Sequence, residues 1–146
     1  MPHVTATKTM PVPASKAWEF VSNWGGTDKW IPGVGPVVVE GSGVGSLRSA
    51  DLAPETGFPG RISERLETFD LHKMSFSYCV VGDNPIPITN YLARMSVKAI
   101  SKDSCEVTWD STWDTELDEA ELIVAFNGLY NLALDNVEQL MLSENQ

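Results

Sequence analysis

The stretch Cys105–Asp114, CEVTWDSTWD, alternates strictly between two kinds of side chain. Successive side chains of a strand point to opposite faces, so every second residue shares a face. One face of this strand would be purely polar: Glu106, Thr108, Asp110, Thr112 and Asp114. The other would hold both tryptophans: Cys105, Val107, Trp109, Ser111 and Trp113. The pattern therefore predicts a strand in a sheet with one covered and one solvated side.

The segment that follows has the three-to-four-residue spacing of an amphipathic helix. Its apolar positions form one stripe: Leu122, Phe126, Leu129, Tyr130, Ala133, Val137, Leu140 and Met141. Glu121, Asn131, Asp135 and Glu138 fall on the opposite side. The acidic run at 114–121 lacks the ligand spacing of a calcium loop and suits the first turn of this helix. An aromatic sheet face under one long helix predicts an internal cavity, and this is where we look for function.

Composition limits the class of protein. The chain has 146 residues and is 42% hydrophobic, which predicts one globular domain over 1–146. Its 10 basic and 20 acidic residues give a net charge of -10, which repels phosphate backbones and anionic lipids. No run of about 18 apolar residues and no signal-peptide pattern is present. We therefore expect a cytoplasmic protein with no nucleic-acid partner and no membrane insertion.

The remaining elements follow from turn and breaker residues. We expect a first strand over 3–10, stopped by Pro11 and Pro13, and then a short helix capped by Ser15 and ending at Val21. A second short helix runs to Trp30 before Pro32 ends it. The predicted strands that follow lie at 36–40, 47–52, about 60–69, 73–81, 89–100 and 105–114. Short connections favour an antiparallel meander closed by the long helix.

Several segments together resemble the polyketide cyclase/dehydrase-like members of the START and Bet v 1 (SRPBCC) superfamily. The resemblance covers nearly the whole chain and rests on the order and spacing of these segments: Val12–Phe20, Lys29–Val34, Gly43–Arg48, Ser63–Leu66, Asn84–Tyr91 and Val107–Trp109. It implies an α+β helix-grip fold, in which a seven-stranded antiparallel sheet wraps around the C-terminal helix and two short helices follow the first strand. It also implies a largely apolar cavity. Members of the superfamily include carriers, sensors, cyclases and dehydratases, so the fold does not select the activity.

Alternation within the strands predicts which side chains face this cavity. On these grounds Phe76, Tyr78 and Tyr91 share the covered side with the two tryptophans, whereas Arg94 faces solvent. Such side chains either fill a core or line a pocket, and the tyrosine hydroxyls either orient a ligand or bond within the core. The candidate ligand-binding set is Trp30, Ile62, Leu66, Phe76, Tyr78, Tyr91, Met95, Trp109, Trp113, Phe126, Tyr130 and Leu134.

Glu64 is the sharpest candidate for chemistry. It lies between Ile62 and Leu66 on the predicted inner face, where lost solvation would favour a general acid or base. The competing interpretation places Glu64 at the cavity rim, paired with Arg48 of the neighbouring strand or with water. Arg48 itself either binds a ligand carboxylate or enolate, or neutralises Glu64.

Other chemistry has little support in the sequence. Cys79 and Cys105 lack metal-type spacing and fit inert packing thiols. His3 and His72 have no evident catalytic partner. The glycine-rich stretch 41–45 joins two strands and lacks the helix and lysine of a phosphate loop. We therefore expect no metal and no cofactor.

Three functions remain open at this stage. The favoured one is binding, as a carrier or sensor, of a small hydrophobic ligand that is aromatic or polyketide-like. The second is a cyclase or dehydratase in which Glu64, with Arg48 or a tyrosine, moves a proton on a carbonyl-bearing substrate. The third is a protein-interaction module. The sequence is compatible with a monomer and with a homodimer.

Overall fold

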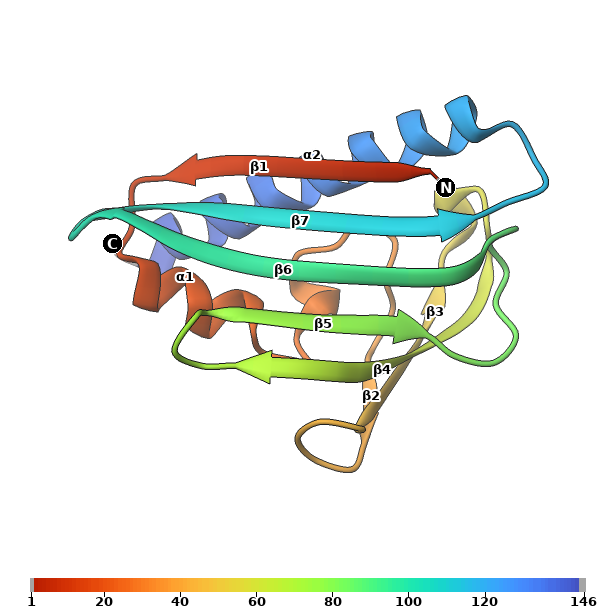
Figure 1. Ribbon diagram of the computed structural model, residues 1–146, viewed down its shortest axis with the longest axis horizontal. Coiled ribbons are helices and arrows are strands. Elements are labelled where there is room, and N and C mark those ends of the chain that lie inside the picture. The colour runs from red at the N-terminus through yellow and green to blue at the C-terminus, as the bar shows by residue number, and fades with distance from the viewer. Residues whose placement is uncertain (1, 145–146) are drawn as a thin grey trace.

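The computed structural model describes residues 2–144 and contains one antiparallel sheet with helices on its concave side (Figure 1). The strands are β1 (His3–Met10), β2 (Val38–Glu40), β3 (Leu47–Leu52), β4 (Gly60–Asp70), β5 (Ser75–Val80), β6 (Thr89–Ser101) and β7 (Ser104–Asp114). The helices are α1 (Ala14–Val21) and α2 (Glu119–Glu144), with two 3₁₀ turns, η1 (Thr27–Lys29) and η2 (Pro54–Thr56).

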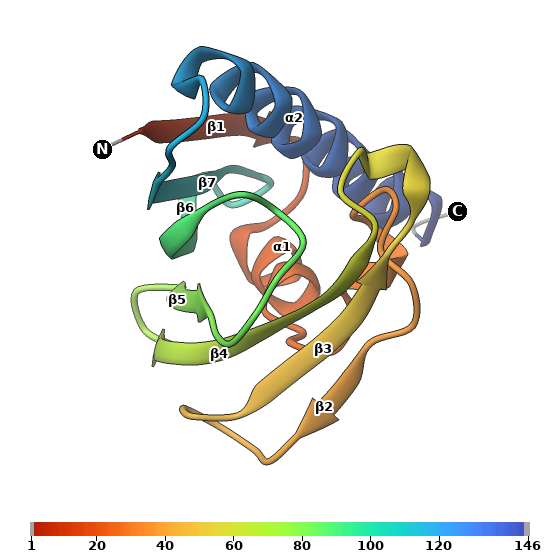
Figure 2. The same cartoon turned by 90° about the vertical axis from the view of Figure 1, so that its right-hand side faces the viewer.

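The sheet has seven strands in the order β1-β7-β6-β5-β4-β3-β2. All pairs are antiparallel, and neighbours from β2 to β7 are consecutive in the chain. The exception is β1, which pairs with β7, so that Val4 lies opposite Ser111. Figure 2 shows the sheet curving around α1 while α2 runs along its open side. This arrangement confirms the predicted helix-grip fold.

The alternation predicted for Cys105–Asp114 is present in the structure. In β7, burial switches at every residue, and Cys105, Val107, Trp109, Ser111 and Trp113 are all buried. Trp109 and Ser111 contact Tyr130 of α2, and Trp113 contacts Phe126, so the covered face of the strand is also the face of the core.

The long helix packs by its apolar stripe. Its buried residues are Leu122, Phe126, Tyr130, Ala133, Leu134, Val137 and Met141, while Leu129 and Leu140 are half-buried. On the solvent side, the Asp135 carboxylate accepts a hydrogen bond from Lys8 Nζ of β1 at 2.7 Å. The helix begins at Glu119, later than the start of the acidic run, because Asp114 still belongs to β7 and Asp118 accepts the backbone N–H of Ala120.

Two details of the first connection differ from the sequence-based expectation. Ser15 does not cap α1, because Pro13 occupies the cap position and its carbonyl accepts the N–H groups of Lys16 and Ala17. The second short helix is only a 3₁₀ turn, η1, whose end is fixed by Trp30 N–H donating to the Thr27 carbonyl. A single short turn is what the surrounding glycines and Pro32 leave room for.

The predicted start of β5 is also corrected. The strand predicted over 73–81 begins at Ser75, because the backbone of Met74 has φ of 51°. A left-handed backbone is unusual for a methionine and is typical of turns, and Met74 belongs to the turn after β4.

Candidate functional site

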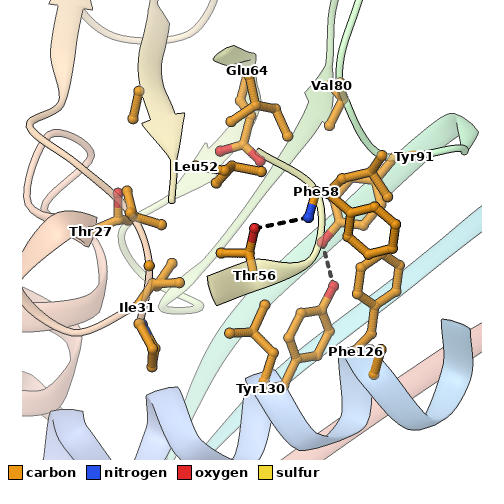
Figure 3. Close-up of a pocket in the computed structure, with 18 of the residues that line it drawn as sticks. Thr27, Ile31, Leu52, Thr56, Phe58, Glu64, Val80, Tyr91, Phe126 and Tyr130 are labelled. Atoms are coloured by element: carbon orange, nitrogen blue, oxygen red, sulfur yellow. Dashed lines mark hydrogen bonds between the residues drawn. The ribbon is translucent and has the colours of Figure 1, made fainter. Parts of the chain in front are cut away.

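A cavity of about 360 Å³ lies between the curved sheet, α2 and three connecting loops (Figure 3). The loops are the one after η1, the one around η2 and the β5–β6 connection. The lining residues are Thr27, Ile31, Pro32, Gly33, Val34, Val37, Arg48, Ser49, Ala50, Leu52, Glu55, Thr56, Phe58, Ile62, Glu64, Tyr78, Val80, Ile86, Ile88, Tyr91, Trp109, Ala125, Phe126, Leu129, Tyr130 and Leu132. The wall is mainly aliphatic and aromatic, as in small-molecule sites.

Aromatic rings form the wall on the α2 side. The rings of Trp109 and Tyr130 stack with their centroids 3.8 Å apart and nearly parallel planes. Phe126 lies one helical turn before Tyr130, and both rings point from α2 toward Tyr91 (Figure 3). The stack joins the strand to the helix, so this wall is held from both sides.

Arg48 and Glu64 face the cavity from adjacent strands. They lie directly opposite in the β3–β4 register, and Arg48 Nε donates to Glu64 Oε1 at 2.7 Å. The guanidinium sits over the ring of Trp24, 3.8 Å from its centroid, and 4.7 Å from that of Tyr78. Its Nη1 donates to the Trp24 carbonyl at 3.1 Å. The predicted pairing of these two charges is therefore present, and the pair neutralises itself at the cavity wall.

A chain of hydroxyl groups runs from the cavity into the sheet. Tyr91 and Tyr130 are hydrogen-bonded through their hydroxyls, and Tyr130 is bonded in turn to Ser111 Oγ at 2.8 Å. Nearby, Trp109 Nε1 donates to the Tyr78 hydroxyl at 3.1 Å. Burial raises the pKa of all three phenols, and the negative charge of Glu64 adds to the rise. These tyrosines are therefore neutral at physiological pH, with protons available to donate.

The position of Tyr91 depends on an irregularity in β6. The register with β7 shifts between Thr89 and Leu92, and Asn90 has φ of 55°. Bulges of this kind re-aim a side chain relative to a regular strand. Asparagine tolerates a left-handed backbone better than most residues, which is a local reason for its presence before Tyr91.

The structure divides the sequence-predicted site residues into two groups. Those that line the cavity are Arg48, Ile62, Glu64, Tyr78, Tyr91, Trp109, Phe126 and Tyr130. Those that are buried in the surrounding core without lining it are Trp30, Leu66, Phe76, Met95, Trp113 and Leu134. Trp30 and Trp113 lie directly behind the wall, since their rings pack edge-on against Trp109 and Phe126. Arg94 is exposed, as alternation predicted.

Sequence reasoning missed the lining residues contributed by loops. Ile31, Phe58 and Ile86 come from three separate connections, where no periodicity marks an inward side chain. The only available signal was an apolar residue in a segment rich in proline and glycine. On α2, the cavity also reaches Ala125 and Leu132, which are exposed residues beside the predicted stripe.

The cysteines form no part of this site. Both are free thiols, and burial together with a hydrogen bond to Glu67 raises the pKa of Cys79 to about 11. Within residues 2–144 we find no cluster of three or more His, Cys, Asp or Glu side chains arranged to hold a metal ion. In the same part of the chain, none of the helices has the length and apolar character needed to cross a membrane.

A seven-stranded sheet gripping one long helix over a largely apolar cavity defines the Bet v 1-like class of helix-grip proteins. Residues 1–141 match the family described as polyketide cyclase / dehydrase and lipid transport, and the chain belongs to that family. A search of curated proteins finds no match.

Solved structures support the same fold. The protein XoxI from Bacillus cereus superposes with a TM-score of 0.85 at 25% identity, covering 100% of this chain and 99% of its own. Norcoclaurine synthase from Thalictrum flavum, in complex with dopamine and hydroxybenzaldehyde, gives 0.77 at 17% identity, with coverages of 97% and 86%. The Zhui aromatase/cyclase from Streptomyces sp. R1128 gives 0.75 at 14% identity, with coverages of 97% and 92%. At these last two identities the likeness concerns the fold alone.

Proposed function

We propose that this protein binds a small, largely apolar ligand with an aromatic ring system in the cavity between the sheet and α2, as a carrier or sensor. The observation that carries the proposal is the cavity of about 360 Å³ with its wall of stacked aromatic rings. An apolar ligand that replaces water there gains hydrophobic and ring-stacking free energy. Membership of a family that includes lipid transport in its description supports the same function.

The charged groups of the wall are compatible with a neutral ligand. Arg48 and Glu64 satisfy each other at 2.7 Å, and the Trp24 carbonyl accepts a further guanidinium proton. A pair that is already hydrogen-bonded needs no charged partner from the ligand. The polar end of the cavity can therefore meet an uncharged ligand without leaving a buried charge unpaired.

Native mass spectrometry of freshly purified protein tests this function. We expect a one-to-one adduct of an apolar molecule, or one-to-one binding of added 2-acetylnaphthalene where purification has stripped the ligand. Ile62→Trp, which places an indole in the cavity, should abolish both. The matched control is Ile100→Trp, because Ile100 is 56% exposed and does not line the cavity. A wild-type protein that carries no adduct and binds no probe would contradict the proposed function.

A second function, proton transfer on a carbonyl-bearing substrate, is favoured by one specific observation. The Glu64 carboxylate and the neutral hydroxyls of Tyr91 and Tyr130 line the same cavity. A carboxylate base can remove a proton next to a carbonyl, and hydroxyl donors in the same cavity can stabilise the enolate oxygen that forms. The family description, which names cyclases and dehydrases, is consistent with such chemistry.

Hydrogen–deuterium exchange at the methyl group of 2-acetylnaphthalene in D₂O separates the two functions. An enzyme that uses Glu64 as base would accelerate this exchange, and Glu64→Gln would remove the acceleration while the dissociation constant stayed within about threefold. A carrier would bind the ketone and leave the exchange at the buffer rate in both proteins. The measurement needs only nuclear magnetic resonance and the probe itself.

A further inference from the structure

Gly128 lies inside α2, where a glycine weakens the helix relative to an alanine. Glycine is usually required where the backbone is left-handed or where another chain segment approaches closely. Neither reason applies here, because the φ of Gly128 is not positive and a Cβ built on this residue meets nothing within 4 Å. What the glycine does change is the stiffness of the helix, which bends more easily at this point.

The part of α2 after Gly128 is fastened to the rest of the molecule by polar contacts. They reach three different segments, namely β1, the loop after η1, and α1. The contacts join Lys8 Nζ to Asp135 Oδ1 at 2.7 Å, Asn136 Nδ2 to the Trp30 carbonyl at 3.1 Å, and Lys16 Nζ to the Met141 carbonyl at 3.3 Å. This half of the helix is therefore fixed by directional bonds as well as by its buried stripe.

The part of α2 before Gly128 lacks such fastening. Within residues 2–144, no hydrogen bond or ion pair joins a side chain of 119–127 to another helix, strand or loop. The Asn127 side chain bonds only to Asn131 of the same helix. Leu122 and Phe126 are the buried side chains of this stretch, whereas Val124 is 72% exposed. Gly128 therefore lies at the boundary between a loosely held and a firmly held half of one helix.

The other end of the loosely held stretch is tied down at Thr115. Its Oγ1 donates to the Pro87 carbonyl in the β5–β6 connection at 2.8 Å. We call residues 116–127, which lie between this bond and Gly128, the flap. In Figure 1 the flap leads from the end of β7 back along the sheet as the first turns of α2. It carries Ala125 and Phe126 of the cavity wall.

Bending at Gly128 would open the cavity at little polar cost. The bend moves Phe126 away from Tyr91, whose ring centroid lies 6.2 Å from its own (Figure 3). Tyr130 lies beyond the glycine and stays bonded to Ser111 Oγ at 2.8 Å. The side-chain contacts that break are therefore apolar and aromatic ones, and no buried side-chain donor or acceptor loses its partner. A motion of this kind costs less than one that strands a buried polar group.

We propose that Gly128 is a hinge at which the flap opens, and that this opening sets the rate at which a ligand enters and leaves the cavity. The inference rests on the proposed function, because it concerns the exchange of a ligand with the same cavity. The hinge itself can be tested without any ligand. Because the flap is closed both in the empty and in the occupied protein, the hinge controls rates and not affinity.

Amide hydrogen exchange measured by nuclear magnetic resonance tests the hinge on the protein without ligand. In the wild-type protein, the amides of 121–127 should exchange faster than those of 132–141, although both stretches belong to one helix. Gly128→Ala has space for its methyl group and should slow exchange over 121–127 by about fivefold, the difference between glycine and alanine in a helix. Exchange over 132–141 should stay the same. Equal exchange along the whole helix in the wild-type protein would overturn the inference.

Stopped-flow tryptophan fluorescence with 2-acetylnaphthalene tests the control of ligand exchange. Gly128→Ala should slow association and dissociation alike, each by about fivefold, because the open flap becomes that much rarer. The dissociation constant should stay within about twofold of the wild-type value. Association and dissociation rates equal to those of the wild-type protein would overturn the inference and leave the binding function standing.

The matched control is Gln139→Gly, which places a glycine in the firmly held half of α2. Gln139 is exposed and does not line the cavity. This variant should lower the urea midpoint, because glycine weakens the helix, and leave both ligand rates unchanged. Ligand rates that rise in Gln139→Gly would show that general helix stability, and not the hinge, controls ligand exchange. A wild-type protein that binds no probe would contradict the proposed function, and amide exchange would then still decide whether Gly128 is a hinge.

Discussion

The guanidinium of Arg48 is held on several sides at once. It donates to Glu64, donates to the Trp24 carbonyl, and lies against the rings of Trp24 and Tyr78. Only 6% of its side chain is exposed, compared with 18% for that of Glu64. The two residues therefore act as one unit, and removing either partner leaves the other charge poorly solvated.

Replacement of Arg48 should be costly for this reason. We expect Arg48→Met to lower the free energy of unfolding by about 3 kcal/mol, as for other broken buried pairs. Adding Glu64→Leu should restore part of that loss, because the stranded carboxylate is removed. Chemical denaturation followed by circular dichroism measures both changes.

The control for this prediction is Arg94→Met. Arg94 is exposed and donates to Ser75 Oγ at 3.1 Å, so its loss should change stability by no more than about 0.5 kcal/mol. A loss at Arg48 as small as that at Arg94 would show that the buried pair contributes nothing to the fold.

At the scale of elements, the helix α2 both stabilises the fold and forms part of the cavity wall. Its inner stripe packs on the sheet, and Phe126 and Tyr130 of the same stripe form a wall of the cavity. Leu134 is fully buried further along the helix, whereas Leu132 is 51% exposed at the cavity edge. Leu132 and Leu134 are only two residues apart, so they lie on different faces of the helix: Leu134 packs in the core and Leu132 borders the ligand space.

A pair of identical substitutions separates these roles. Leu134→Ala should lower the free energy of unfolding by about 3 kcal/mol, because it removes buried methyl groups and leaves a cavity. Leu132→Ala should cost no more than about 0.5 kcal/mol, since this side chain is already half in solvent. Urea denaturation of the two variants checks the difference, and similar losses would mean that the helix is not seated as described.

Most helices and strands were predictable, because the spacing of apolar residues that indicates each one lies within a short stretch of sequence. The two-residue period of 105–114 and the three-to-four-residue spacing of 122–141 each fit one kind of structure. Capping was less predictable: Ser15 has the right chemistry, but the carbonyl of Pro13 takes the first N–H groups. The 3₁₀ turn at Thr27–Lys29 likewise reflects chain geometry between glycines and proline rather than a periodic signal.

At the scale of the whole molecule, the cavity couples ligand binding to stability. A ligand that binds only the folded state stabilises it by mass action, by about 2.7 kcal/mol at a concentration one hundred times the dissociation constant. We expect 2-acetylnaphthalene at that ratio to shift the urea midpoint of wild-type protein upward accordingly. In Ile62→Trp, whose cavity is filled by the indole, the urea midpoint should not change. A change equal to that of the wild-type protein would show that the probe binds outside the cavity.

The amino-acid sequence by itself determined the order of elements, the covered face of each main strand and the inner stripe of α2, because these follow from local periodicity. It also offered the pairing of Arg48 with Glu64 as one interpretation, because the two strands are neighbours along the chain, and the structure contains this pair.

Only the tertiary structure decided which buried residues line the cavity and which pack behind it. Trp109 and Trp113 lie on the same face of β7 and are both buried, yet of the two only Trp109 lines the cavity. Ile31, Phe58 and Ile86 reach it from separate loops, and the hydrogen-bonded hydroxyls of Tyr91, Tyr130 and Ser111 join β6, α2 and β7. Such contacts depend on sheet curvature and on where the helix settles, which arise from packing summed over the whole chain rather than from any local pattern.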